Sequence, residues 1–401
     1  MTWTKRGIVV VLTGAILPVT LGCSFSGSPP KATAGADRTA TAQGPMRSIR
    51  PVESCAAKVY SRMTQVQRVG QLFIVGIASY DPAANVARPV DTYHFGSLLF
   101  TGDYTRSVSA TRAATRRMQA LATTKATAGA RFLIGANQEG GQIQQLAGPG
   151  FSAMPSALAQ GGLSVSGLRR SAEVWGRELR SAGLNLDLAP VMDVVPAATA
   201  SENQPIGALG REFGYSPGTV AAHGAAFIEG MRSAGIATTA KHFPGLGRVV
   251  GNTDFTSRVV DSTTTAGDPY LASFQEAINI GVPFVMVSLA TYTRIDPDHM
   301  AAFSSKVMTG LLRDRMRFGG VIMSDDLGQA AAVADMSPGR RAVDFLDAGG
   351  DLITSQDLGP AISMEYAVLG RAATDASFRS VVATAVLRVL DAKQALGLLP
   401  C

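Results

Sequence analysis

Short apolar runs alternate with longer amphipathic stretches along most of the chain. After Pro51, eight short runs consist almost entirely of apolar and small residues, a composition typical of buried strands. The stretches between them repeat apolar residues at spacings of three and four, which is the pattern of a helix with one buried face. We therefore expect strands at 71–77, 96–100, 132–136, 184–190, 236–240, 284–288, 320–323 and 352–354, and helices at 107–122, 167–181, 217–233, 269–280, 304–315 and 339–346.

This alternation predicts the α/β class. Eight strand–helix units that close on themselves form a (β/α)8 TIM-type barrel, and an open doubly wound sheet is the alternative. No fixed-period repeat and no long linker divides residues 51–401, so we expect a single domain there.

The first 50 residues have a different character. Lys5 and Arg6 precede an apolar stretch from 7 to 21, and Cys23 follows Gly22. This order predicts a lipoprotein signal peptide over 1–22, cleaved before a lipid-bearing Cys23; an ordinary signal peptide with an incidental cysteine is the alternative. Residues 23–50 are poor in large apolar side chains and predict a flexible tether. We expect an exported protein, held by its lipid on the extracytoplasmic face of the cell membrane.

Charge and cysteine content limit the possible partners. The chain has a net charge of +6, and loss of Lys5 and Arg6 with the signal peptide leaves +4. Without a basic run this surplus is too diffuse to predict nucleic-acid binding.

Cys55 and Cys401 lie at the two ends of the folded part in an oxidising compartment, which predicts a disulfide between them; two free thiols are the alternative. We expect a monomer that contacts the membrane only through its lipid.

Polar residues gather where the predicted strands end. Lys241 and His242 follow the fifth strand, at the end where barrel enzymes place their active-site groups. Asp325 and Asp326 follow the seventh strand, and two adjacent carboxylates require a polar cavity or a cation. Such a carboxylate can attack an anomeric carbon. The alternative is a helix cap with a structural ion pair.

Two further stretches suggest recognition of hydroxyl groups. The third strand leads into a turn rich in amides, 137–145, which begins with Asn137, and Arg211 lies in a Gly-Arg-Glu-Phe-Gly segment. A side-chain-stabilised turn and a surface ion pair are the alternatives. The four histidines show no metal-ligand spacing, and no phosphate-binding glycine loop is present, so we expect neither a metal nor a cofactor.

Taken in order, these segments resemble the N-terminal barrel of glycoside hydrolase family 3, in its NagZ-like β-N-acetylglucosaminidase branch. The resemblance extends from about residue 61 to 399. It implies that Asp325 is the nucleophile and that Lys241, His242 and Arg211 hold sugar hydroxyls. The matching motifs are Gln138-Glu139-Gly140-Gly141, Leu188-Ala189-Pro190-Val191-Met192-Asp193, Gly210-Arg211-Glu212-Phe213-Gly214, Lys241-His242-Phe243-Pro244-Gly245 and Ser324-Asp325-Asp326-Leu327.

The chain departs from the branch at the proton donor. The branch has Asp-Ser-His in the loop after strand five, whereas this chain has Asn-Thr-Asp, ending at Asp254. Asn137 stands where an aspartate is usual, and Gln145, Leu246 and Leu289 also replace typical residues of the branch. Either Asp254 is itself the proton donor, because a neighbouring carboxylate can raise its pKa, or the segment is only a capped turn.

The resemblance predicts a retaining glycoside hydrolase that acts on carbohydrate. Its substrate would be a terminal β-linked N-acetylglucosamine or related hexosaminide of a cell-wall-type glycan, with Asp325 as nucleophile and Asp254 as acid and base. Lys241, His242, Arg211 and Asn137 would bind the sugar. The alternative is a catalytically weak or inactive sugar-binding lipoprotein on the same barrel.

Overall fold

A computed structural model describes residues 54–77 and 82–401. The predicted signal peptide, the lipidated Cys23 and the tether lie outside the described residues. Val52–Cys401 forms one compact unit, in line with the single domain expected after Pro51. Among the described residues, no helix has both the length and the hydropathy that a membrane span requires.

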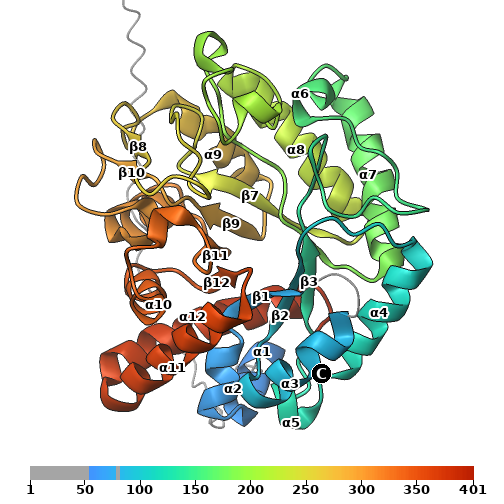
Figure 1. Cartoon of the computed structure of the whole chain (residues 1–401), viewed down its shortest axis with the longest axis vertical. Helices are drawn as coiled ribbons and strands as arrows, with labels where there is room; N and C mark the ends of the chain where they lie inside the picture. Colours follow the sequence, from blue (N-terminus) through green and yellow to red (C-terminus); the bar gives the residue numbers. More distant parts are fainter. Residues whose placement is uncertain (1–53, 78–81) are drawn as a thin grey trace, which may run out of the picture. The chain divides into compact units, whose positions relative to one another are not determined.

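The main sheet is a closed barrel of eight parallel strands, which confirms the (β/α)8 prediction and excludes the open sheet (Figure 1). Each predicted apolar run contributes one strand, and neighbours in sequence are neighbours in the barrel. In order around the barrel the strands are β1 (Phe73–Ile77), β2 (Ser97–Phe100), β3 (Leu133–Ala136), β6 (Leu186–Asp187), β7 (Ala237–Phe243), β9 (Phe284–Val287), β11 (Val321–Asp326) and β12 (Leu352–Ser355).

Most strand ends differ from the prediction by one or two residues, and the larger differences affect the barrel mouth. β11 continues beyond Met323 to Asp326, so Asp325 and Asp326 belong to the strand rather than following it. β6 is shorter than its apolar run, although residues 188–190 still form backbone hydrogen bonds with β3 and β7. β7 continues beyond Ala240 to Phe243, so Lys241 and His242 belong to a fully buried strand rather than to the loop after it. Two short pairings at strand ends build the rim: β4 (Gln138–Gly140) with β5 (Ile143–Gln144), and β8 (Val260–Asp261) with β10 (Thr291–Tyr292).

Large apolar side chains fill the inside of the barrel. Ile74, Leu99, Phe284 and Met323 belong to an interior cluster in which every core member is almost fully buried. Val389 and Leu398 join the same cluster from the C-terminal part of the chain, so this segment closes the bottom of the barrel. The barrel interior is therefore a packed core, closed at its lower end by this segment.

Helices cover the outside of the barrel, and local sequence explains their ends. α7 (Val165–Ala182) begins after Ser164, whose side chain caps Gly167 N–H, and ends at the left-handed Gly183. α8 (Pro217–Ser233) has the predicted bounds and packs along α7. The predicted helix at 304–315 is a π-helix, η5 (Lys306–Arg315). The remaining α-helices are α1 (Cys55–Arg62), α2 (Gln65–Gly70), α3 (Pro82–Tyr93), α4 (Val108–Ala120), α5 (Thr124–Thr127), α6 (Ala157–Gln160), α9 (Ala272–Asn279), α10 (Pro338–Asp347), α11 (Leu358–Thr374) and α12 (Ala376–Ala395).

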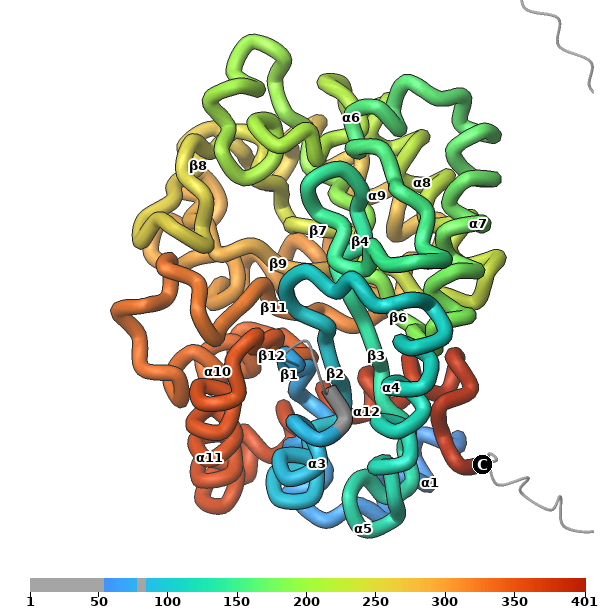
Figure 2. Tube along the Cα trace, turned by 45° about the vertical axis from the view of Figure 1, so that its right-hand side comes forward, coloured from blue at the N-terminus to red at the C-terminus, as the bar shows by residue number. Residues whose placement is uncertain are grey.

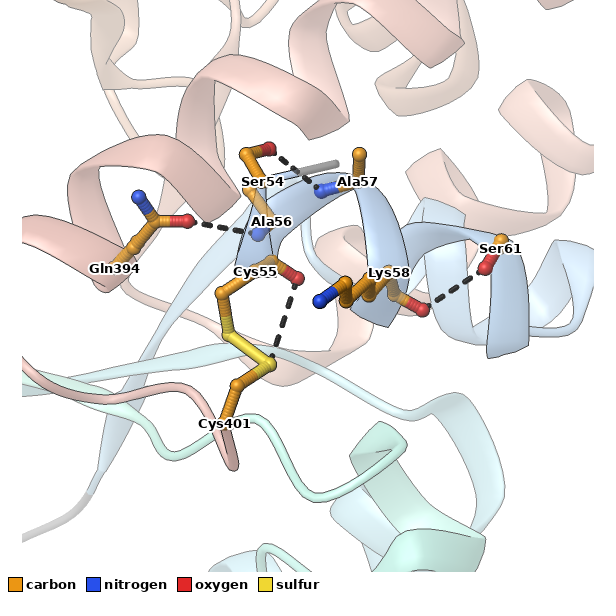
Figure 3. Close-up of a disulfide and its surroundings, with 8 residues drawn as sticks. All are labelled: Ser54, Cys55, Ala56, Ala57, Lys58, Ser61, Gln394 and Cys401. Atoms are coloured by element: carbon orange, nitrogen blue, oxygen red, sulfur yellow. Dashed lines mark hydrogen bonds between the residues drawn. A yellow bond between two sulfur atoms is a disulfide. The ribbon is translucent and has the colours of Figure 1, made fainter. Parts of the chain in front are cut away.

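The two ends of the described chain are joined covalently. Cys55 and Cys401 form the predicted disulfide, with a Cα–Cα distance of 5.9 Å across a sequence separation of 346 (Figure 3). Nearby, Gln394 Oε1 accepts a hydrogen bond of 2.9 Å from Ala56 N–H. Figure 2 shows α1, α5 and the C-terminus on the lower side, whereas β4 and β8 lie on the upper side. The disulfide therefore lies on the opposite side from the rim.

Candidate active site

A cavity of about 340 Å³ lies at the carboxyl ends of the barrel strands. Its volume is within the range of small-molecule sites. The structure brings every predicted catalytic and sugar-binding residue into its lining: Asn137, Arg211, Lys241, His242, Asp254 and Asp325.

Glu139 organises the positive charges of the cavity. Its carboxylate receives hydrogen bonds from Arg211 Nε at 2.8 Å and Nη2 at 2.7 Å, and Lys241 Nζ lies 2.6 Å from Oε1. Burial alone would raise the pKa of Glu139, but the charges and hydrogen bonds of Arg211 and Lys241 outweigh it and lower this pKa to about 2. The three side chains thus form a buried, charged cluster that is fixed before any ligand binds.

The donors left for a ligand are fewer than the sequence suggested. Arg211 presents its fork to Glu139, and its Nη1 donates to Pro205 O at 2.7 Å, so three of its five N–H donors are already engaged and two remain. Lys241 also donates to Asn137 Oδ1 at 2.7 Å. An ammonium has three N–H donors, so one donor of Lys241 remains for a sugar oxygen.

Asp193 holds His242 in a fixed orientation. Its Oδ2 lies 2.8 Å from His242 Nδ1, and its Oδ1 accepts from the backbone N–H groups of His242 and Leu246, both at 3.0 Å. Because a carboxylate only accepts, Nδ1 carries the proton of this contact. Nε2 is then the ring nitrogen that a ligand can use.

The twin acids at the end of β11 have different environments. Asp326 is buried, and its carboxylate accepts from the backbone N–H groups of Gly328, Gln329 and Gln356 at 2.9, 3.2 and 3.0 Å. Asp325 is only partly buried and lines the cavity, where its charge acts on Arg211 and on Asp254. Asp326 thus stabilises the turn after β11, without the helix cap and ion pair of the alternative, whereas Asp325 is available for chemistry.

The loop after β7 brings Asp254 to the same cavity. Its segment does contain a capped turn, because Asn252 Oδ1 accepts from Asp254 N–H at 2.9 Å. The carbonyls of Thr253 and Asp254 accept from Ala332 and Ala331, which follow β11, at 3.0 and 3.1 Å. These bonds tie the loop of Asp254 to the segment that follows Asp325.

The surroundings of Asp254 favour its protonated form. The carboxyl retains an exposed surface because the cavity is open, but the protein atoms around it remove part of its hydration. This desolvation, followed by the negative charge of Asp325, raises the pKa of Asp254 to about 6, although His242 and Arg211 act in the opposite direction. A carboxyl group with such a pKa can donate a proton near neutral pH.

Two important residues were missed at the sequence level. Glu139 and Asp193 were recognised as motif members, but neither was predicted to organise the site. An acid next to a predicted cationic or imidazole group is the signal that could have found them. Within residues 54–77 and 82–401, no group of three or more His, Cys, Asp or Glu side chains is arranged so that it could hold a metal ion.

The fold and this cavity define a class: a barrel enclosing two electrostatically interacting carboxyl groups, Asp254 and Asp325, and a charged cluster for a polar ligand. Comparison with known proteins identifies the family. The model of the glycosyl hydrolase family 3 N-terminal domain matches residues 64–389. The chain belongs to glycosyl hydrolase family 3.

Individual relatives agree with this assignment. A beta-hexosaminidase from Stenotrophomonas maltophilia (strain K279a) is 34% identical over 232 residues, which are 55% of this chain and 66% of the relative. One from Xylella fastidiosa (strain M23) is 35% identical over 208 residues, 50% of this chain and 59% of the relative. The matched part of the chain thus spans less than two thirds of these curated relatives.

A solved structure gives fuller coverage. The crystal structure of a beta-N-acetylhexosaminidase from Beutenbergia cavernae DSM 12333 is 44% identical, with a TM-score of 0.80. The match covers 83% of this chain and 99% of that chain.

Proposed function

We propose that the protein is a retaining glycoside hydrolase that removes a terminal β-linked N-acetylglucosamine, or a related hexosaminide, from cell-wall-type glycans. The observation that carries this proposal is the pairing of Asp325 and Asp254 in one cavity, where the charge of Asp325 helps to keep Asp254 protonated. The similarity to a beta-hexosaminidase and to the solved beta-N-acetylhexosaminidase supports the substrate class.

The chemistry proceeds in two displacements. Asp325 attacks the anomeric carbon while Asp254 gives its proton to the departing glycosidic oxygen, so the bond to the leaving group breaks as a glycosyl ester forms. Asp254, now ionised, then takes a proton from water. The resulting hydroxyl attacks the same carbon, breaks the ester to Asp325 and leaves the sugar with its original configuration.

The charged cluster would hold the terminal sugar during both steps. The remaining donor of Lys241 and the Nε2 atom of His242 are suited to ring hydroxyls, and the amide of Asn137 can both donate and accept. Arg211 would contribute mainly through Glu139, which fixes Lys241, and less through direct contact. The alternative of an inactive sugar-binding protein needs no proton donor, and no described contact favours it over hydrolysis.

The pH dependence of hydrolysis tests this assignment. With nitrophenyl β-N-acetylglucosaminide, kcat/KM of the wild type should decline above about pH 6, because Asp254 must be protonated to act as the acid. The Asp254→Ala variant should lose this decline, and azide should restore its turnover as a β-glycosyl azide, since azide needs no general base. Nitrophenyl β-glucoside, which lacks the acetamido group, serves as the comparison substrate.

The nucleophile is tested separately. Asp325→Ala should show no turnover of either substrate, and a mechanism-based fluorosugar should label Asp325 in the wild type. Equal release of nitrophenol by the wild type and Asp325→Ala, with saturable glycan binding by both, would instead establish a binding protein. Asp254→Ala with an unchanged pH profile would assign the proton transfer to another group.

We also propose that the protein is exported and anchored through a lipid on Cys23, as a monomer on the outer face of the cell membrane. The arrangement of Lys5, Arg6, the apolar stretch and Cys23 supports this proposal. Mass spectrometry of the N-terminal peptide from membrane fractions tests it. A peptide that begins at an unmodified residue other than Cys23 would contradict it.

A further inference from the structure

An aromatic side chain stands at the mouth of the active-site cavity without a packing partner in the core. Phe255 follows Asp254 directly, lines the cavity, and is 83% exposed. Within the described part of the chain it is the most exposed large hydrophobic residue, and none of the other exposed ones lines this cavity. An exposed phenyl ring contributes little burial energy to the fold, and because this ring lines the cavity it offers an apolar surface to a ligand there.

The loop that carries Phe255 does not depend on the ring. Thr253 is 2% exposed and anchors the loop in the interior, and Asn252 O accepts from the N–H groups of Phe255 and Thr256 at 3.0 and 2.8 Å. The bonds from Ala331 and Ala332 hold the loop from the other side. The backbone from which the ring projects is therefore fixed, and removal of the ring leaves all of these contacts in place.

The depth of the other cavity residues indicates which part of a substrate the ring meets. Lys241 and His242 are 2% and 4% exposed and form the floor, where the charged cluster would hold the terminal sugar. Asp254 stands higher, at the open part of the cavity, and it must contact the glycosidic oxygen. Whatever is attached through that oxygen extends from Asp254 toward solvent, and Phe255 is the adjacent residue.

We propose that Phe255 forms a binding site for the leaving group, in which its ring stacks on the apolar C–H face of the sugar attached to the departing oxygen. The inference rests on the proposed hydrolysis and adds a preference: leaving groups that contain a sugar ring are favoured over small ones. An aromatic face is suited to this contact because it is flat and apolar, and it covers a pyranose face without requiring particular hydroxyls.

The same site has a consequence for the second displacement. A sugar held on Phe255 places a hydroxyl near the glycosyl ester of Asp325, where it competes with water. Asp254 removes the proton of that hydroxyl, the new glycosidic bond forms at the anomeric carbon, and the ester bond breaks. The ring therefore favours transfer to an added sugar over hydrolysis.

The test compares two substrates that share the terminal sugar and differ in the leaving group. β-N-Acetylglucosaminyl fluoride has a leaving group without a ring, whereas the disaccharide of two β-1,4-linked N-acetylglucosamine units has a sugar there. In Phe255→Ala, the ratio of kcat/KM for the disaccharide to that for the fluoride should fall by about tenfold, the scale of one lost apolar contact. Phe255→Trp should restore the ratio, and the yield of transfer product should fall in Phe255→Ala.

Val260→Ala is the matched control, because Val260 is 52% exposed near the same loop and does not line the cavity. Its ratio should equal that of the wild type. If the wild type hydrolyses both substrates and Phe255→Ala shows the same ratio of kcat/KM values, the leaving-group site is overturned and the proposed function stays intact. No hydrolysis of either substrate by the wild type overturns the proposed function, and the leaving-group site with it.

Discussion

The substitution Glu139→Gln tests whether the buried cluster is stabilised by its negative charge. The amide keeps the shape of the side chain but leaves Arg211 and Lys241 without a carboxylate. The shift of the Glu139 pKa from 4.5 to about 2 corresponds to about 3 kcal/mol of folding free energy at neutral pH. The loss of one partner from a buried ion pair has a cost of similar size, about 3–5 kcal/mol.

The pH dependence distinguishes this charge from a general packing effect. Because the pKa of Glu139 is lower in the folded state, its contribution is fully present above about pH 4.5 and is lost as the pH falls toward 2. The difference in unfolding free energy between wild type and Glu139→Gln should therefore be about 2 kcal/mol smaller at pH 3 than at pH 7.

Urea unfolding followed by tryptophan fluorescence measures this difference, because Trp175 on α7 is buried and reports the folded state. Glu173→Gln is the control: Glu173 forms an exposed ion pair with Arg177, and its loss should cost less than about 1 kcal/mol. If wild type and Glu139→Gln differ in unfolding free energy by the same amount at pH 7 as at pH 3, the carboxylate charge does not stabilise the cluster.

Two further predictions concern stability. The double variant Cys55→Ser/Cys401→Ser should lose up to about 4–5 kcal/mol of unfolding free energy, because the disulfide closes a loop of nearly the whole domain. Calorimetry measures this loss, and an unchanged melting temperature would contradict the prediction. Asp326→Ala should lower the melting temperature by leaving three backbone N–H groups without their acceptor, whereas Asp325→Ala should abolish turnover and melt like the wild type. Equal melting temperatures for the two variants would contradict the structural role of Asp326.

The sequence predicted the barrel well because burial on both faces leaves an apolar run for every strand. It could not predict the end of β7, since Lys241 looks like the first residue of a loop until its partner is known. That partner, Glu139, is far away in sequence, and only the closed barrel brings the two side chains to 2.6 Å. Strand order therefore follows from local pattern, whereas burial of a charge depends on a distant acid.

The twin acids illustrate the same limit. Position in a motif pointed to Asp325, but the sequence did not separate a cavity carboxylate from a turn carboxylate. That difference depends on the backbone N–H groups of residues 328, 329 and 356, which bind Asp326, whereas Asp325 accepts only from the N–H of Asp326 and stays partly exposed. In the same way, the raised pKa of Asp254 depends on the fold bringing Asp325 near it.

The cystine between residues 55 and 401 has a practical consequence for attachment of the protein to a surface. Since Cys401 lies beneath the plugged floor of the barrel, a support coupled at the C-terminus should leave the cavity entrance unobstructed. Immobilised protein should then bind ligands in the cavity as readily as it does in solution, without reorientation on the surface.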